Sequence, residues 1–188
     1  MSVATMSRAQ AIAQAHAYFD SGAMKADLTR LVAIPTESQN PARAADLDFY
    51  IDQEMTPLFQ SMGFTCHRLT HAKAKGPFLF AERMEGAHLP TIFGYGHGDV
   101  IRGLDKDWQD GLSPWTLTEI GDRWYGRGVV DNKGQHLINL QALKTVLGLR
   151  GHLGFNIKYL IEMGEEMGSP GLRELCAEHG ELLSLIHI

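Results

Sequence analysis

The chain has 188 residues, of which 44% are hydrophobic and 21% are charged, and its formal net charge at pH 7 is −5. This composition is typical of a globular protein with a buried core and argues against a disordered chain. A net negative charge without clusters of Lys and Arg argues against a nucleic-acid partner, and no apolar run approaches the roughly 20 residues of a membrane helix. The first residues lack the pattern of a secretory signal, so we expect a cytoplasmic protein without a membrane partner.

Two helices are predicted in the first third of the chain. The first ends at Ile34-Pro35, because proline disfavours helix in the residue that precedes it. The second spans about Ala42 to Met62 along one apolar stripe, and Pro57 is expected to bend it. Gly63 is well placed to end this second helix.

Strands and helices alternate through the rest of the chain. Apolar runs bounded by glycine or proline predict strands at 64–69, 78–82, 91–96 and 155–161, and helices follow Gly134 and span 170–179. A long polar and aromatic connection lies between residues 99 and 132, and a connection of this length is usually functional or contains small strands. The alternation predicts an α/β fold with a mixed, largely parallel sheet flanked by helices. Ligands bind such sheets beyond the carboxyl ends of the strands.

The first cluster of candidate functional residues, GYGHGD, lies at the end of the predicted strand 91–96. His97 and Asp99 are two residues apart, so in an extended backbone they point to the same side. This spacing suits a metal-binding imidazole and the carboxylate that holds its ring. The cluster also resembles a dinucleotide-binding glycine turn, but Asp99 occupies the place of the third glycine and a long loop follows instead of a helix. A surface histidine beside a turn is the remaining alternative.

The second cluster, GRGVVDNKG, precedes the helix that follows Gly134. It is not a phosphate-binding loop, because Lys133-Gly134 reverses the required Gly-Lys order and no Ser or Thr follows. The functional interpretation is that Asp131 is a carboxylate delivered to the site just before a helix. The alternative is a solvated turn in which Asp131 or Asn132 caps that helix.

The third cluster, EMGEEMGS, follows the predicted strand 155–161. Adjacent carboxylates such as Glu165 and Glu166 repel each other, so a pair lining a cleft needs a cation or a shared proton. Two exposed glutamates at the start of a helix are the alternative, although the glycines on both sides favour a functional role. One imidazole with three carboxylates at the ends of successive elements is a zinc-type hydrolytic ligand set, and a bridging carboxylate would permit two metal ions.

The three clusters, in this order and spacing, closely resemble the motifs of the M20 family of metallopeptidases. The resemblance covers about residues 25–182, and the sequence is most similar to the dipeptidase-type members. It implies a zinc-dependent hydrolase of the amide bond in dipeptides or related small peptides. N-acyl amino acid deacylases and carboxypeptidases of the same family are alternatives, and so is a metal-free binding domain that keeps only the fold.

The resemblance also implies a role for each motif residue. His97 binds one zinc ion, Asp131 bridges both ions, and Glu166 binds the other, with cobalt or manganese as alternative metals. Asp99 clamps the imidazole, and Glu165 is the general base. The peptide bond after the bridging Asp131 is expected to be cis.

The resemblance further implies parts that these residues do not supply. Each metal in the family has one more protein ligand downstream, and an inserted lid domain usually forms a homodimer. We therefore interpret residues 1–182 as the N-terminal part of a catalytic domain that is inactive by itself. Residues 183–188, LSLIHI, are interpreted as a read-through tail of non-native sequence.

Overall fold

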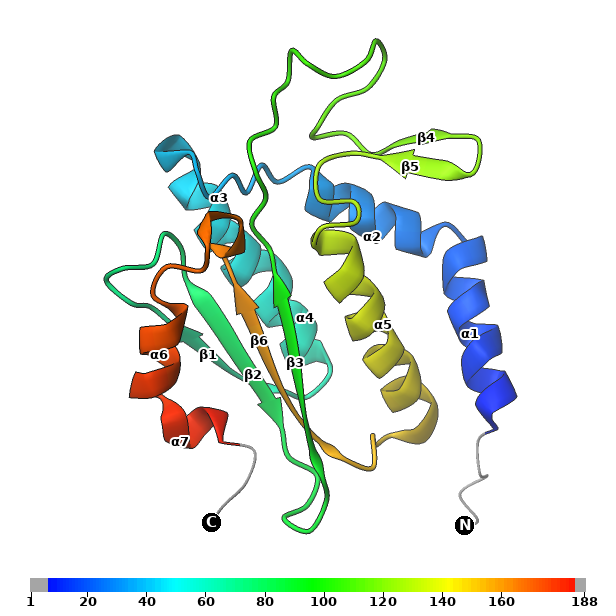
Figure 1. Cartoon of the computed structure of the whole chain (residues 1–188). Helices are drawn as coiled ribbons and strands as arrows, with labels where there is room; N and C mark the ends of the chain where they lie inside the picture. The colour runs from blue at the N-terminus through cyan, green and yellow to red at the C-terminus, as the bar shows by residue number, and fades with distance from the viewer. Residues whose placement is uncertain (1–6, 185–188) are drawn as a thin grey trace.

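A computed structural model describes residues 7–184 of the chain (Figure 1). The elements, in chain order, are α1 (Arg8–Asp20), α2 (Ala23–Val32), η1 (Pro41–Arg43), α3 (Ala44–Phe49), the π-helical η2 (Tyr50–Met55), α4 (Thr56–Ser61), β1 (Thr65–Leu69), β2 (Phe78–Arg83), β3 (Thr91–His97), β4 (Thr118–Ile120), β5 (Arg123–Tyr125), α5 (Lys133–Arg150), β6 (Asn156–Glu162), η3 (Glu165–Met167), α6 (Leu172–Glu178) and α7 (Gly180–Leu183). Most of the interpreted tail, residues 185–188, lies outside the described residues.

The helices of the first third lie where the sequence predicts them, but each is divided into shorter elements. The first helical stretch is divided into α1 and α2 at Gly22, whose φ of +79° favours glycine, and α2 ends before Ile34-Pro35 as expected. The second predicted helix runs from η1 to α4. Its hydrogen bonding changes to the π-helical pattern in η2, which ends two residues before Pro57, a residue that lacks an N–H group.

The sheet is mixed and flanked by helices, as predicted, but within residues 7–184 it is not largely parallel. Its strand order is β1-β2-β6-β3, and only the β3–β6 pair is parallel. The short connection 70–77 can join β1 and β2 only as antiparallel neighbours, because a parallel pair needs a long crossover. The connection between β3 and β6 contains α5 and is such a crossover.

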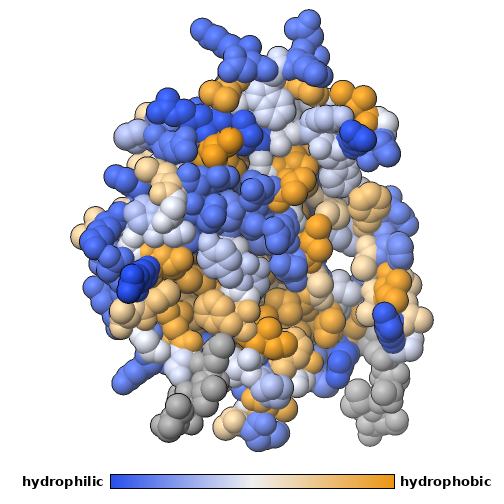
Figure 2. All heavy atoms as spheres, viewed as in Figure 1, coloured by the Kyte–Doolittle hydropathy of each residue, from blue (hydrophilic) through white to orange (hydrophobic). Residues whose placement is uncertain are grey.

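Apolar side chains on both faces of the sheet form the core. Alternate residues of β2 point to opposite faces: Leu79 packs with α2, α4 and α5, whereas Phe78 and Phe80 pack with Leu175 of α6. The sheet therefore lies between two unequal helical layers (Figure 1). Figure 2 shows hydrophobic residues exposed over the lower part of the sheet on the viewed face.

The long connection contains the β4–β5 hairpin, in agreement with the expectation that it carries small strands or a function. Helix α5 begins at Lys133 and therefore includes Gly134, which the predicted helix followed. No helix among residues 7–184 is long and apolar enough to cross a membrane.

Candidate metal centre

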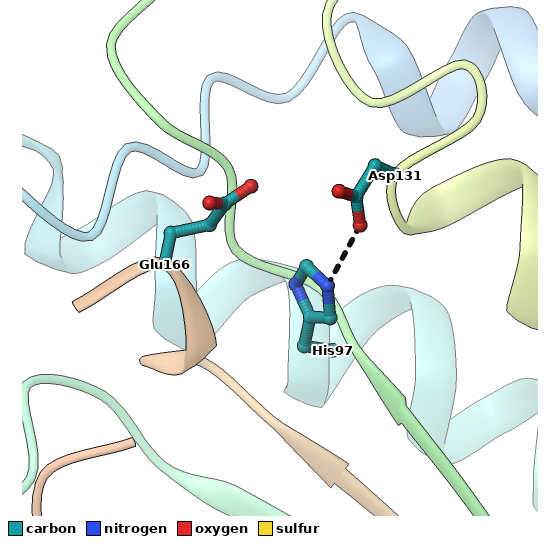
Figure 3. Close-up of side chains that lie close together, drawn as sticks. All are labelled: His97, Asp131 and Glu166. Carbon is teal, nitrogen blue, oxygen red and sulfur yellow. Dashed lines mark hydrogen bonds and ion pairs between the residues drawn. The ribbon is translucent and has the colours of Figure 1, made fainter. Parts of the chain in front are cut away.

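Three of the predicted metal ligands meet at the carboxyl ends of the parallel strands β3 and β6. His97 is the last residue of β3, Asp131 directly precedes α5, and Glu166 lies in η3 after β6. One ligand atom from each residue lies within 4.8 Å of the other two (Figure 3). The predicted convergence of these side chains is confirmed, while their roles stay predictions.

The imidazole of His97 is buried, with its two ring nitrogens facing different partners. Nδ1 donates a hydrogen bond to the backbone oxygen of Asp99 at 3.1 Å, and Nε2 lies 3.0 Å from Oδ1 of Asp131. Because Nδ1 is engaged by this backbone oxygen, Nε2 is the ring nitrogen that faces the carboxylates. The imidazole is therefore held in an orientation that presents Nε2 to a metal ion.

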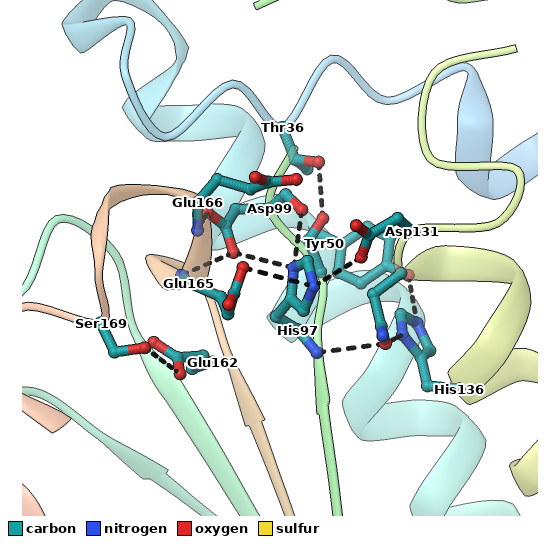
Figure 4. Close-up of polar contacts among 12 residues, drawn as sticks. Thr36, Tyr50, His97, Asp99, Asp131, His136, Glu162, Glu165, Glu166 and Ser169 are labelled. Carbon is teal, nitrogen blue, oxygen red and sulfur yellow. Dashed lines mark hydrogen bonds and ion pairs between the residues drawn. The ribbon is translucent and has the colours of Figure 1, made fainter. Parts of the chain in front are cut away.

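Asp99 contacts His97, and its carboxylate also accepts backbone hydrogen bonds that the sequence did not indicate. Oδ1 lies 3.4 Å from Nδ1 of His97, consistent with the predicted clamp. The same carboxylate accepts hydrogen bonds from the backbone N–H groups of Glu165 at 3.1 Å and Glu166 at 3.2 Å (Figure 4). The buried Asp99 therefore ties the end of β3 to the turn that carries both glutamates.

Glu165 and Glu166 point in different directions, as expected for adjacent residues with different roles. Oε2 of Glu165 lies 3.7 Å from Nε2 of His97, and its side chain is 43% exposed. Glu166, with Asp131, instead completes the group of potential ligands. Figure 4 shows the Glu165 carboxylate beside the imidazole and the Glu166 carboxylate farther out.

The centre carries excess negative charge around a single imidazole. Burial acts to lower the pKa of His97, but the hydrogen bond to Asp99 and the charges of Asp99 and Glu165 outweigh it and raise the pKa to about 9. Burial, together with the charge of Asp131, raises the pKa of Glu166. Within residues 7–184, no Lys or Arg forms an ion pair with Asp131, Glu165 or Glu166. Such a cluster is stabilised by a divalent cation.

A buried hydrogen-bonded chain behind the centre was missed by the sequence analysis. Oδ1 of Asn132 accepts hydrogen bonds from the backbone N–H of His97 at 3.4 Å and from Nδ1 of His136 at 3.2 Å. Nε2 of His136 accepts a bond of 2.6 Å from the Tyr50 hydroxyl. The i, i+4 spacing of Asn132 and His136 was a usable signal, whereas Tyr50 is 86 residues from His136.

The two residues that follow Asp131 fix the backbone at this point. The peptide bond between Asp131 and Asn132 is cis, as predicted. The Lys133 side chain is completely buried, and Nζ donates to the backbone oxygens of Leu31 at 2.9 Å and Ile34 at 2.7 Å. Lys133 thereby caps the carboxyl end of α2 and joins it to the start of α5.

Glu162 belongs to the third motif but does not join the metal group. Its Oε1 accepts hydrogen bonds from the hydroxyls of Tyr95 at 2.5 Å and Ser169 at 2.8 Å. These contacts link the ends of β3 and β6 to the residues after η3. Glu162 therefore supports the turn that carries Glu165 and Glu166.

A cavity of about 390 Å³ opens directly beside Asp131 and Glu166. Its remaining walls come from the long connection and include Trp108, Trp124 and Arg127. The candidate metal group therefore faces a space of the size of a small ligand.

Comparison with known sequences agrees with this arrangement. The sequence pattern of "Peptidase family M20/M25/M40" matches residues 94–188, which is half of the chain and includes all three motifs. The chain belongs to this family. The M20 resemblance inferred from the three motifs is therefore confirmed, and members of the M20 family depend on a metal.

Individual relatives of this M20 chain include peptidases of small peptides. The chain is 44% identical over 101 residues to the "Beta-Ala-His dipeptidase" of Mus musculus, a match that covers 53% of this chain and 20% of that protein. It is 30% identical over 171 residues to the "Probable di- and tripeptidase DUG2" of Saccharomyces cerevisiae, covering 83% and 19%. The chain thus spans about one fifth of the length of these relatives.

The M20 fold is also found in solved structures. The crystal structure of human carnosine dipeptidase 1 superimposes with a TM-score of 0.83 at 27% sequence identity. The superposition covers 92% of this chain and 38% of that one. The mixed sheet flanked by helices is therefore the architecture of part of an M20 peptidase.

Proposed function

We propose that this protein is a metal-dependent peptidase that hydrolyses the amide bond of dipeptides or related small peptides. The observation that carries the proposal is the convergence of His97, Asp131 and Glu166 beside Glu165. The dipeptidase names of the relatives support the choice of substrate.

The donor set fits a divalent cation. His97 offers Nε2, since its Nδ1 is engaged by Asp99, and two carboxylates lie within 4.8 Å of it. Imidazole with carboxylates is a common ligand set for zinc, and we propose two zinc ions that share Asp131, with cobalt and manganese as alternatives. A divalent cation bound there supplies Lewis-acid activation of the scissile carbonyl and of a water molecule.

The side chains around this group have separate tasks. Glu165 lies within 3.7 Å of Nε2 of His97 without joining the ligand group, so its carboxylate can take a proton from the attacking water and transfer it to the leaving amine. Asp99 orients the His97 ring and holds the backbone of Glu165 and Glu166.

Substitution of the two glutamates separates these tasks. In the full-length enzyme, we expect Glu165→Gln to lower turnover of a dipeptide by about 10²–10⁴-fold with nearly normal metal content, because a general base is lost and no ligand is lost. Glu166→Ala is expected to lose both turnover and metal. Turnover rates and elemental analysis check both, with the exposed Glu181→Gln as the matched control. Metal loss in Glu165→Gln together with metal retention in Glu166→Ala would mean that the two roles are reversed.

The described residues do not provide a full set of ligands for two zinc ions. Counting Asp131 twice, His97, Asp131 and Glu166 would give each ion two protein ligands, whereas catalytic zinc sites usually have three. We propose that further ligands come from outside the 188 residues, so that this chain by itself binds zinc weakly and hydrolyses nothing. Tight stoichiometric zinc binding with dipeptide turnover by the 188-residue chain would contradict this.

Substrate, assembly and location complete the proposal. A panel of dipeptides and N-acyl amino acids distinguishes peptidase from deacylase activity. The proposed homodimer is checked by light scattering, and the proposed cytoplasmic location by cell fractionation.

A further inference from the structure

His136 is a completely buried imidazole that lies behind the candidate metal centre and is not one of its ligands. Nδ1 lies 3.2 Å from Oδ1 of Asn132, and Nε2 lies 2.6 Å from the Tyr50 hydroxyl (Figure 4). An amide oxygen can only accept, so Nδ1 donates to it and Nε2 accepts the proton of the hydroxyl. Burial, with the charges of Lys133 and His97, lowers the pKa of His136 to about 3, so the ring is neutral. His136 therefore connects Tyr50 to Asn132 and keeps no nitrogen for a metal ion.

Asn132 extends this connection to the metal centre, because it directly follows the predicted ligand Asp131. Its Oδ1 accepts the hydrogen bond of His136 and a second one of 3.4 Å from the backbone N–H of His97. The backbone oxygen of Asn132 also accepts from the N–H of His136 at 3.1 Å. Asn132 thus links the residue that carries one carboxylate to the strand end that carries the imidazole. A shift of Asn132 changes the spacing between Asp131 and His97.

Tyr50 holds the far side of the His136 ring. It is the first residue of the π-helical η2 and is completely buried. Its ring packs so closely against Gly98 that a Cβ at that position would overlap it, and Nζ of Lys133 lies 5.1 Å from the ring centroid. Short π-helical turns are rare and are frequent at functional sites. The Tyr50 hydroxyl is therefore a fixed point to which His136 is attached.

The polar side chains of this region are confined to the turn of α5 next to Asp131. Among the buried side chains of α5, Lys133 and His136 in the first turn are polar, whereas Leu137 and Leu140 are apolar. Burying polar groups adds little net stability compared with apolar groups of the same shape. The hydrogen-bonded chain is thus better explained by a task at the metal centre than by the packing of α5.

We propose that Tyr50 and His136 form a positioning pair that holds Asn132, and through it Asp131, at the distance from His97 that a metal ion requires. The inference rests on the proposed metal-dependent function. Neither member of the pair belongs to the group of potential ligands. Residues that only support a metal ligand typically change metal affinity or activity by about 10–100-fold, so the effect of the pair is measurable.

Cobalt titration of the full-length enzyme tests the positioning pair without turnover, because the visible absorption of bound Co²⁺ reports both affinity and coordination geometry. His136→Leu removes both side-chain hydrogen bonds and is expected to weaken Co²⁺ binding about 10–100-fold and to change the absorption band. His136→Asn places an N–H at the same number of bonds from the backbone as Nδ1, so it is expected to recover most of the affinity. Tyr50→Phe removes only the hydroxyl, and its expected loss is smaller than that of His136→Leu.

Leu140→Ala is the matched control, since Leu140 is buried in the same helix one turn further on and its truncation leaves a cavity in the core. It is expected to lower the melting temperature at least as much as His136→Leu and to leave the affinity and spectrum of Co²⁺ unchanged. Each titration is performed below the melting transition of the variant. Unchanged affinity and spectrum in His136→Leu would reject the positioning pair. An equal loss of affinity in Leu140→Ala, or no recovery in His136→Asn, would reject it as well.

Kinetics at saturating metal separate this inference from the proposed function. Because the positioning pair does not act on the substrate directly, His136→Leu is expected to lower kcat of dipeptide hydrolysis with little change in KM. If dipeptides are cleaved and His136→Leu changes neither Co²⁺ binding nor kcat, the positioning pair is wrong and the peptidase function stands. If no dipeptide is cleaved but Co²⁺ binding depends on His136 as expected, the positioning pair stands and the peptidase function fails.

Discussion

The two ends of β6 both bury polar side chains, but they satisfy them in opposite ways. At the amino end, Oδ1 of Asn156 accepts hydrogen bonds from the N–H groups of Glu85 at 2.7 Å and Gly86 at 3.0 Å. Nδ2 of Asn156 donates to the oxygens of Gly86 at 2.8 Å and Leu89 at 3.1 Å. At this end, one side chain satisfies four backbone groups, so the cluster is complete without a ligand.

Glu85 closes the same end of the strand. Its carboxylate accepts hydrogen bonds from the N–H groups of Leu153 and Gly154, both at 2.8 Å, and from Nε of Arg83 at 3.0 Å. This anion has both hydrogen-bond donors and a cation within the chain. A carboxylate in such surroundings holds the fold together.

The carboxyl end of β6 has the opposite character. Asp131, Glu165 and Glu166 surround the imidazole of His97, and none of them is paired with Lys or Arg among residues 7–184. The comparison teaches that burial of polar groups does not by itself indicate function. A cluster that lacks its counter-charge indicates a ligand, and a cluster that contains it indicates structure.

The largest expected effect comes from Asp131→Ala at the carboxyl end. Metal affinity is expected to fall by more than the roughly 10–100-fold typical of residues that only support a ligand. The free energy of unfolding of the metal-free protein is expected to change by less than about 0.5 kcal/mol, because the Asp131 side chain is 72% exposed. Metal titration and denaturant unfolding measure the two quantities. A large loss of metal-free stability would break the comparison.

Asn156→Ala at the amino end is expected to give the reverse pattern. It leaves four backbone groups without their partner, so the free energy of unfolding should fall by about 3 kcal/mol. Metal affinity of the folded variant should be unchanged, since the substituted side chain lies at the opposite end of β6. Denaturant unfolding and metal titration check this, and a coupled loss of metal would show that the two ends are not independent.

A smaller effect with a defined pH dependence is expected for Glu85→Gln. Partial burial acts to raise the pKa of Glu85, but the N–H groups of Leu153 and Gly154 and the charge of Arg83 outweigh it and lower the pKa. A lowered folded-state pKa contributes stability that is present above about pH 4.5 and is lost as pH falls through the folded-state value. We expect a cost of about 1–2 kcal/mol at pH 7.

The measurement is the free energy of unfolding of both proteins between pH 7 and pH 3. The difference should shrink as the pH falls below about 4.5, because Glu85 becomes protonated first in the unfolded chain and then, at its lowered pKa, in the folded protein. The exposed Glu181→Gln is the control and should show no such difference. A constant difference across this range would mean that the charge of Glu85 has no stabilising role.

The sequence predicted the carboxyl end of β6 much better than the amino end. His97, Asp131, Glu165 and Glu166 lie in glycine-framed motifs directly after strands or before a helix, so local patterns were sufficient to find them. Asn156 is the first residue of β6 and carried no such signal. Its partners are about 70 residues away in sequence and become neighbours only when β2 pairs with β6.

Strand direction was the part of the fold that local patterns could not predict. Alternation of strands and helices correctly indicated a mixed sheet with flanking helices. It did not reveal that β2 is inserted antiparallel beside β6, because that pairing joins segments far apart in the chain. Tyr50 was missed for the same reason, since its partner His136 is distant in sequence.

The burial of Lys133 makes this side chain an internal reporter for chemical labelling. Amine-acetylating reagents modify neutral amino groups that solvent reaches, and Nζ of Lys133 is enclosed while it donates to the oxygens of Leu31 and Ile34. Acetylation therefore requires the end of α2 to separate from the start of α5. Its rate, followed by mass spectrometry, would count openings of the backbone next to Asp131, whereas exposed lysines such as Lys106 would react at once.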